Sequence, residues 1–293
     1  MKNPLVPGKE LSTTLLLLAI TVIWGLTFAV IKDVLRFVAP IYFIFWRFLI
    51  ATLVVYLIFA RKIHADRGRS LVPGMIVGLS VFLGFLTQTL GLTQTTANKS
   101  AFITSMYVIM VPFLSFLLER KPVSRGALYG SVLACLGLYF LARPDFSGVN
   151  VGDGLTLICA LAFGFQIVLT NIYSKAYDGS VLLFYELLLT AVLCLPASLF
   201  WGGWHITLNR QVLLSILYVA VLATAFNIYI QNTFQKFVTS VKAAIIYTTE
   251  PIFAAVFAFL LIGELPTWSL LIGGGLIIAG LFVSGVGSKP SGC

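Results

Sequence analysis

The stretch LSTTLLLLAITVIWGLTFAVI, residues 11–31, contains no charged side chain. At about 1.5 Å per helical residue, a run of this length crosses a hydrocarbon core of about 30 Å. It is too long for a secretory signal peptide, and a small-residue cleavage site does not follow it convincingly. The stretch therefore predicts a transmembrane helix.

Similar apolar runs continue through the rest of the chain. Of its 293 residues, 59% are hydrophobic and 10% are charged, which is more apolar surface than a soluble domain of this size can bury. We predict an all-α membrane protein with ten transmembrane helices. Their expected positions are 11–31, 40–60, 71–92, 98–118, 125–141, 152–172, 180–201, 211–232, 240–262 and 267–286.

The basic residues indicate how the chain is oriented. The net charge is +9, but Lys and Arg fall in short loops rather than on one face, which argues against a nucleic-acid partner. Ten spans put both termini on one side, where thirteen Lys and Arg residues gather against five on the other. The positive-inside rule then predicts cytoplasmic N- and C-termini in a plasma (inner) membrane, with the lipid bilayer as partner.

The chain matches itself in two registers, which indicates an internal repeat. At an offset of 139, Trp24 meets Phe163, Gly25 meets Gly164 and Arg47 meets Glu186; at 143, Gln88 meets Gln231 and Lys99 meets Lys242. We expect one repeat at 1–142, a linker at 143–153, a second repeat at 154–286 and a tail at 287–293. An odd number of helices per repeat makes the second half inverted, as in secondary transporters with a central substrate cavity.

Small residues recur on the fifth and tenth predicted helices at spacings that allow close helix packing. They pack these helices within the bundle or form a dimer face, so a monomer and a homodimer both stay open. These residues are Gly130, Ala134, Gly137, Gly273, Gly275, Ala279 and Gly280.

Three ionisable side chains lie within predicted spans: Arg47, Glu186 and Glu250. Such groups are costly in lipid, so each should face a cavity or a partner. Glu250 lies about 15 Å into its helix, next to Pro251, and is the candidate proton site; a role in binding a substrate ammonium or a neighbouring helix stays open. Arg47 is expected to hold helix carbonyls or an anionic group of the substrate.

Uncharged polar and aromatic side chains complete the predicted substrate cavity. Amides within spans bridge helices or point into a wet cavity, and aromatic side chains could line it. The candidates are Gln88, Gln166, Asn227 and Gln231, with Trp24, Phe28, Tyr107 and Tyr247.

Several motifs resemble the EamA family of the drug/metabolite transporter superfamily. They are GLTQTTANKSAFIT at 91–104, residues 107–112, Thr249-Glu250-Pro251, Gly263-Glu264 and the Gly-rich segment 273–280. The resemblance covers essentially the whole chain and implies a ten-helix basket that moves small metabolites, often outward. One departure is Glu119-Arg120-Lys121-Pro122, where the family has a Gly-Glu-Arg-like turn.

Other function classes fit the sequence less well. Zinc-protease and nucleophile-elbow motifs are absent from the sequence, so we expect no enzyme activity, no metal and no cofactor. A channel would show polar rings around a pore. An exchanger of phosphorylated metabolites such as nucleotide sugars would need several basic groups in the cavity. We therefore expect a secondary transporter of amino acids or other small amphipathic molecules, working by alternating access, with helices 3, 4, 8 and 9 moving most.

Overall fold

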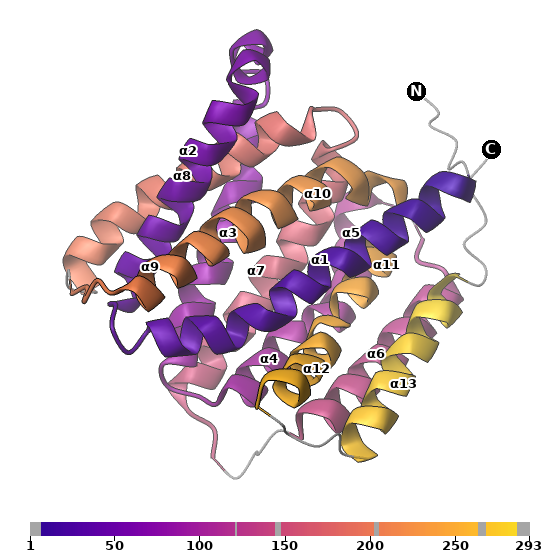
Figure 1. Ribbon diagram of the computed structural model, residues 1–293. Helices are drawn as coiled ribbons and strands as arrows, with labels where there is room; N and C mark the ends of the chain where they lie inside the picture. Colours follow the sequence, from indigo (N-terminus) through magenta and orange to yellow (C-terminus); the bar gives the residue numbers. More distant parts are fainter. Residues whose placement is uncertain (1–6, 121, 144–147, 202–204, 263–267, 286–293) are drawn as a thin grey trace.

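The computed structural model describes residues 7–120, 122–143, 148–201, 205–262 and 268–285. This part of the chain is almost entirely helical and contains ten segments long and apolar enough to cross a membrane (Figure 1), so the predicted fold class is confirmed. Of these, seven spans are single helices: α1 (Pro7–Val34), α2 (Pro40–Asp66), α3 (Leu71–Leu92), α6 (Arg125–Ala142), α7 (Val151–Tyr173), α8 (Gly179–Trp201) and α13 (Trp268–Gly285).

The other three spans are interrupted. The fourth consists of α4 (Ala97–Ser105) and α5 (Tyr107–Glu119), and the ninth of α11 (Ser240–Tyr247) and α12 (Glu250–Ile262). The eighth runs through α9 (Arg210–Leu217), the π-helical segment η1 (Tyr218–Phe226), α10 (Asn227–Phe234) and the short 3₁₀ turn η2 (Gln235–Phe237). The sequence predicted each of these three spans as one uninterrupted helix, and this part of the prediction is wrong.

Local hydrogen bonds explain where the repeat-related helices begin. Thr96 caps α4 by accepting a hydrogen bond from the backbone N–H of Lys99, and Thr239 caps α11 by accepting one from Lys242. These two threonines are 143 residues apart in the chain, as are the two lysines. Such side-chain caps satisfy amides that have no partner within the helix. The matching caps give both interrupted spans the same local geometry.

Helix contacts follow a two-fold pattern. If each span of the first repeat is replaced by its counterpart five spans later, and the reverse, the contacts between spans are reproduced. The third span packs on α7 and the eighth on α1; likewise α1 contacts the ninth span, and α7 contacts the fourth. The pairs α2·α8 and α6·α13 map onto themselves. This pattern is what two repeats of five spans require.

The glycines of the fifth and tenth spans are used inside the bundle. Helices α6 and α13 lie side by side at one edge of the molecule (Figure 1). A Cβ placed on Gly137 would lie 2.5 Å from the Gly273 carbonyl oxygen, and one on Gly130 would lie 2.6 Å from that of Gly280. The helices therefore pack backbone against backbone, and only glycine fits at these crossings.

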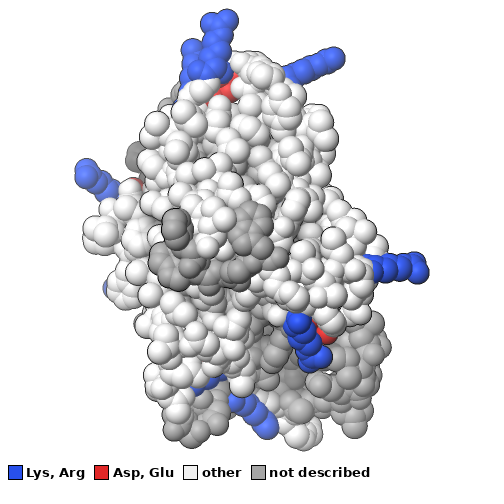
Figure 2. Space-filling view, turned by 90° about the vertical axis from the view of Figure 1, so that its left-hand side faces the viewer, with Lys and Arg blue, Asp and Glu red and all other residues white. Residues whose placement is uncertain are grey.

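The bundle has two ends, which are named here for the chain termini. The terminal face is the end where α1 begins and α13 ends (Figure 1); the opposite face lies across the membrane from it. Charged side chains are sparse on the surface drawn in Figure 2, and broad areas carry neither sign of charge. Many large apolar side chains are exposed on the helices, including Leu57, Phe116 and Phe282, as expected for surfaces that face lipid.

Candidate functional site

A cavity lies in the middle of the bundle and is lined by residues of seven spans. Its walls are mostly apolar and aromatic, with a small set of polar groups among them. The polar lining consists of Thr27, Arg47, Gln88, Thr89, Thr104, Ser105, Gln166, Gln231 and Glu250, and the aromatic lining of Trp24, Phe85, Tyr107, Phe163 and Tyr247. An apolar pocket with a few convergent polar groups is typical of small-molecule sites.

The cavity is asymmetric along the membrane normal. From α1 it takes Trp24, Thr27 and Ile31, and from α3 it takes residues between Val81 and Leu92. Both helices start at the terminal face, so these residues occupy their far halves. From α7 the lining includes Phe163, Gln166 and Ile167, which lie at mid-helix. The cavity therefore reaches from mid-membrane toward the opposite face.

A hydrogen-bonded group of amides closes the cavity toward the terminal face. Gln231 Nε2 donates to Gln166 Oε1 at 3.2 Å and to Gln235 Oε1 at 3.0 Å. Gln235 Oε1 also accepts from the Tyr247 hydroxyl at 2.9 Å, and Gln235 Nε2 donates to the Ile167 carbonyl at 2.6 Å. This group joins the sixth, eighth and ninth spans into a floor.

Further polar contacts lie below that floor. Asn171 Nδ2 donates to Ser240 Oγ at 2.8 Å and to Glu119 Oε1 at 3.3 Å. Glu119 also faces the ammonium of Lys175 at 3.6 Å. These residues tie the ends of the fourth and sixth spans to the start of the ninth, so the terminal face is sealed by a second layer.

Arg47 extends from α2 into the cavity wall and is 2% exposed. Its Nε donates to Thr224 Oγ1 at 2.7 Å, and its Cζ lies 4.3 Å from the centre of the Phe85 ring. A guanidinium has five N–H donors, yet within the described residues its only hydrogen bond is the one to Thr224. The end formed by the two Nη groups thus lacks a protein acceptor there.

Glu250 begins α12 and lines the same cavity as Arg47. Among the described residues, no ion pair within 4.0 Å joins the two side chains. The cavity therefore presents one basic and one acidic group that are not paired with each other.

Trp24 is held in a fixed orientation on the cavity wall. Its indole N–H donates to the Ala223 carbonyl of η1 at 2.8 Å. Its ring packs edge-on against Tyr247, with 5.5 Å between the ring centres. A buried indole needs such an acceptor for its polar end, and the contact fixes α1 to the π-helical segment.

Eight of the eleven residues predicted for the cavity do line it: Trp24, Arg47, Gln88, Tyr107, Gln166, Gln231, Tyr247 and Glu250. The side chain of Phe28 lies outside the part of the chain that the structure describes.

Glu186 and Asn227 are not part of the lining. Glu186 is fully buried and accepts a hydrogen bond from Asn232 Nδ2 at 2.9 Å. Its backbone packs on Gly78 of α3, and no described residue of α8 lines the cavity. Asn227 Nδ2 donates to the Ile20 carbonyl at 2.9 Å, which binds the eighth span to α1. One polar atom of each side chain therefore bonds to a neighbouring helix, whereas Glu186 Oε2 and Asn227 Oδ1 have no hydrogen-bond partner among the described residues.

Other lining residues were not predicted from the sequence. The most informative are Phe85 and Thr89, which flank Gln88 on one face of α3 together with Leu92. Their spacing of three and four residues marks a single helix face, and this signal could have been found from Gln88 alone. Thr224 was also missed, because it acts on Arg47 rather than on the cavity surface.

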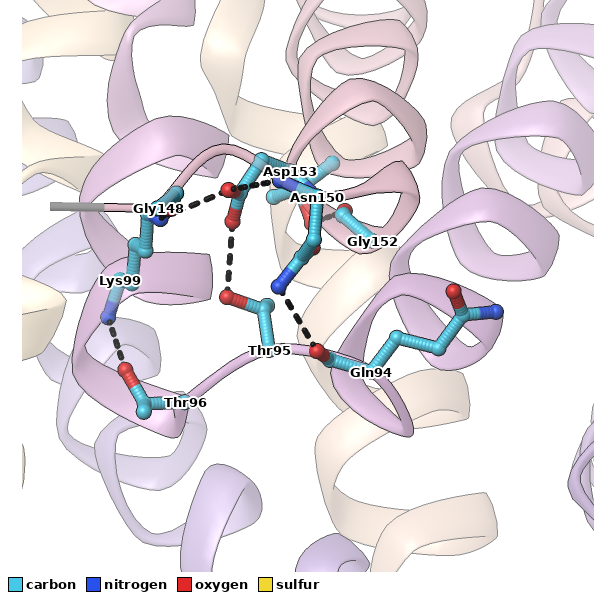
Figure 3. A network of polar contacts seen from close by, with 9 residues as sticks. Gln94, Thr95, Thr96, Lys99, Gly148, Asn150, Gly152 and Asp153 are labelled. Carbon is cyan, nitrogen blue, oxygen red and sulfur yellow. Dashed lines mark hydrogen bonds and ion pairs between the residues drawn. The ribbon is translucent and has the colours of Figure 1, made fainter. Parts of the chain in front are cut away.

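Matching ion pairs lie outside the cavity, one toward each face. At the opposite face, Lys99 of α4 approaches Asp153 of α7 at 2.7 Å and donates to the Gly148 carbonyl at 2.6 Å; Figure 3 shows the surrounding network, in which Thr95 also donates to Asp153. At the terminal face, Lys242 of α11 approaches Glu10 of α1 at 2.6 Å. Both lysines are therefore engaged by carboxylates.

Comparisons with known proteins agree with this architecture. The model of the EamA-like transporter family matches the chain twice, at residues 11–143 and 150–286. An uncharacterized transporter of Archaeoglobus fulgidus is 34% identical over 275 residues, which cover 94% of this chain and 86% of the relative. A protein of Salmonella typhimurium named a probable amino-acid metabolite efflux pump is 26% identical, with 94% and 95% covered.

The fold also occurs among solved structures. One crystal structure superposes with a TM-score of 0.79 at 15% identity, and the match covers 94% of this chain and 97% of that one. At this identity the similarity concerns the fold alone.

Proposed function

The chain belongs to the EamA-like transporter family, and from this premise we propose that it exports small amphipathic zwitterions, such as amino acids, by alternating access. The observation that carries the proposal is the pair of Arg47 and Glu250, which face one cavity and form no ion pair with each other within the described chain. A zwitterion offers each of them an opposite charge. An apolar cargo side chain would pack against the aromatic wall.

The charge inventory of the cavity supports a zwitterion over a phosphorylated cargo. A phosphate or nucleotide sugar carries at least one full negative charge and favours several basic groups. Arg47 is the one basic side chain among the described residues of the lining. Lys99 and Lys242, the other candidates, are bound by Asp153 and Glu10. The exchanger of phosphorylated metabolites remains the second candidate.

The repeats supply a mechanism. Residues 1–142 and 154–286 are taken as two inverted halves whose conformations exchange when the cavity opens to the other side. In the present state the floor is made by Gln231, whose repeat mate Gln88 faces the cavity. When the two halves exchange conformations, Gln88 would take the role of Gln231 and close the cavity toward the opposite face. With thirteen basic residues on the terminal side, we place that side in the cytoplasm and the chain in the plasma (inner) membrane.

Counterflow in proteoliposomes tests the proposal directly. Vesicles are preloaded with unlabelled amino acids, nucleobases, sugars or sugar phosphates, and entry of the labelled compound is followed. We expect saturable exchange of zwitterionic amino acids. Absence of exchange across the panel by folded protein would refute the carrier proposal, and exchange of sugar phosphates alone would favour the second candidate.

A Glu250→Gln variant tests proton coupling in the same vesicles. If Glu250 carries the proton, exchange persists in the variant while accumulation driven by a pH gradient is lost. Glu186→Gln is a matched control, since Glu186 is a buried carboxylate of another span outside the cavity. Loss of both exchange and accumulation in Glu250→Gln would indicate that Glu250 binds the cargo ammonium, as the zwitterion proposal has it, and would not support a separate proton role.

A further inference from the structure

The eighth span contains a π-helical segment, η1, at the level of the cavity. Such segments are rare within α-helices and occur frequently at functional sites. Here the changed backbone register has a visible consequence. Thr224 Oγ1 donates to the carbonyl of Val219, five residues earlier, at 2.8 Å. The hydroxyl proton is thereby committed to the helix, and the oxygen lone pairs remain available as acceptors.

Arg47 uses this acceptor. Its Nε–H donates to Thr224 Oγ1 at 2.7 Å, and Thr224 itself is 0% exposed. The threonine hydroxyl thus links the backbone of η1 to the guanidinium of α2 through two consecutive hydrogen bonds. Because the hydroxyl has one proton, its direction is fixed by the Val219 carbonyl, and it meets Arg47 only as an acceptor.

Phe85 restricts the guanidinium from a second direction. Its ring centre lies 4.3 Å from Arg47 Cζ, and the Phe48 ring lies at 5.5 Å. A guanidinium is attracted to aromatic faces. The two rings therefore restrict the plane of the guanidinium, and Thr224 binds its Nε edge. The end carrying Nη1 and Nη2 is the part with no protein acceptor among the described residues. Two parallel N–H groups at that end match the two oxygens of a carboxylate.

We infer that Thr224 is a positioning residue for cargo recognition: through Nε it orients Arg47 so that the Nη end binds the cargo carboxylate. This inference rests on the proposed transport function and adds to it a specificity determinant. It explains why a buried guanidinium with a single hydrogen bond to the described part of the protein is tolerated, since the cargo supplies the anionic acceptor. The hydroxyl of Thr224, rather than its methyl group, carries the effect.

The test compares two probes that differ at the carboxylate alone, L-phenylalanine and L-phenylalaninamide, in proteoliposome exchange. Thr224→Val keeps the side-chain shape and removes the acceptor. We expect it to raise the half-saturation concentration for phenylalanine about tenfold, with the maximal rate and the value for the amide unchanged. Thr224→Ser, which retains the hydroxyl, is expected to restore the wild-type value.

Thr52→Val is the matched control, because Thr52 is a buried threonine of α2 whose hydroxyl bonds only to the Phe48 carbonyl in the described chain. It should leave both probes unchanged. Equal effects of Thr224→Val on both probes, or failure of Thr224→Ser to restore the phenylalanine value, would overturn the inference. If Thr224→Val does not fold, Thr224→Ala replaces it, and the same difference between the two probes is expected. Wild-type exchange restricted to compounds without a carboxylate would overturn the inference yet leave the carrier; no exchange at all would overturn both.

Discussion

Gln231 on the eighth span donates to Gln166 on the sixth at 3.2 Å, directly below the cavity. The residues at the matching positions of the first repeat are Gln88 and Thr27, and both line the cavity. Among the described residues, no hydrogen bond joins those two: the Thr27 hydroxyl donates to the Trp24 carbonyl. The sixth and eighth spans are thus joined by a hydrogen bond between these side chains, whereas the matching side chains of the first and third spans are not bonded to each other within the described chain.

This asymmetry predicts which positions approach one another in each state. In a background without native cysteines, Gln166→Cys with Gln231→Cys should react with a short bifunctional thiol reagent in the resting protein and abolish exchange. Thr27→Cys with Gln88→Cys should react mainly during exchange, because these positions meet only when the cavity closes toward the opposite face. Crosslinking is followed by gel mobility and flux by counterflow. Efficient crosslinking of either pair with undiminished flux would contradict the alternation.

Some features of the site could be predicted from the sequence because they depend on one residue in its local context. Arg47 and Glu250 stand out as charges within apolar runs, and the cost of a charge in lipid places them against a cavity or a partner. The ten spans follow from length and hydropathy. Glu186 met the same criterion but faces other helices, since position around a helix axis depends on neighbours that a single sequence does not identify.

Other features depend on the backbone register, which leaves little trace in composition. The segment YVAVLATAF at Tyr218–Phe226 is simply apolar, yet it adopts π-helical hydrogen bonding that gives Thr224 its role. The break at Met106 likewise has no marker in the sequence, because Pro112 lies inside α5 rather than at the break. In the ninth span the break falls just before Pro251, where proline at the start of a helix is well tolerated, so this break, unlike the other two, has a marker in the sequence.

The two repeat-related ion pairs are expected to contribute unequally to stability. The Lys99 and Asp153 side chains are 8% and 7% exposed, whereas those of Lys242 and Glu10 are 16% and 33% exposed. Lys99→Met leaves a buried carboxylate unpaired and should cost about 3–5 kcal/mol. Lys242→Met should cost clearly less, since water screens the more exposed pair. Unfolding in mixed detergent–SDS micelles measures both, and an equal or reversed order would contradict this reasoning.

The crossing of α6 and α13 gives the last prediction, in which two glycines of one helix should respond differently. A Cβ on Gly273 would lie 2.6 Å from the Gly137 carbonyl and 2.8 Å from Leu141 Cβ, while one on Gly275 would meet nothing within 4 Å. Gly273→Ala should therefore force the helices apart and destabilise the protein by about 1–3 kcal/mol. Gly275→Ala, two residues away on the exposed side, should leave the melting temperature unchanged or raise it, because alanine favours a helix over glycine. Thermal unfolding in detergent, followed by tryptophan fluorescence, compares the two variants with wild type. Equal tolerance of both substitutions would mean that α6 and α13 do not pack backbone against backbone at this crossing.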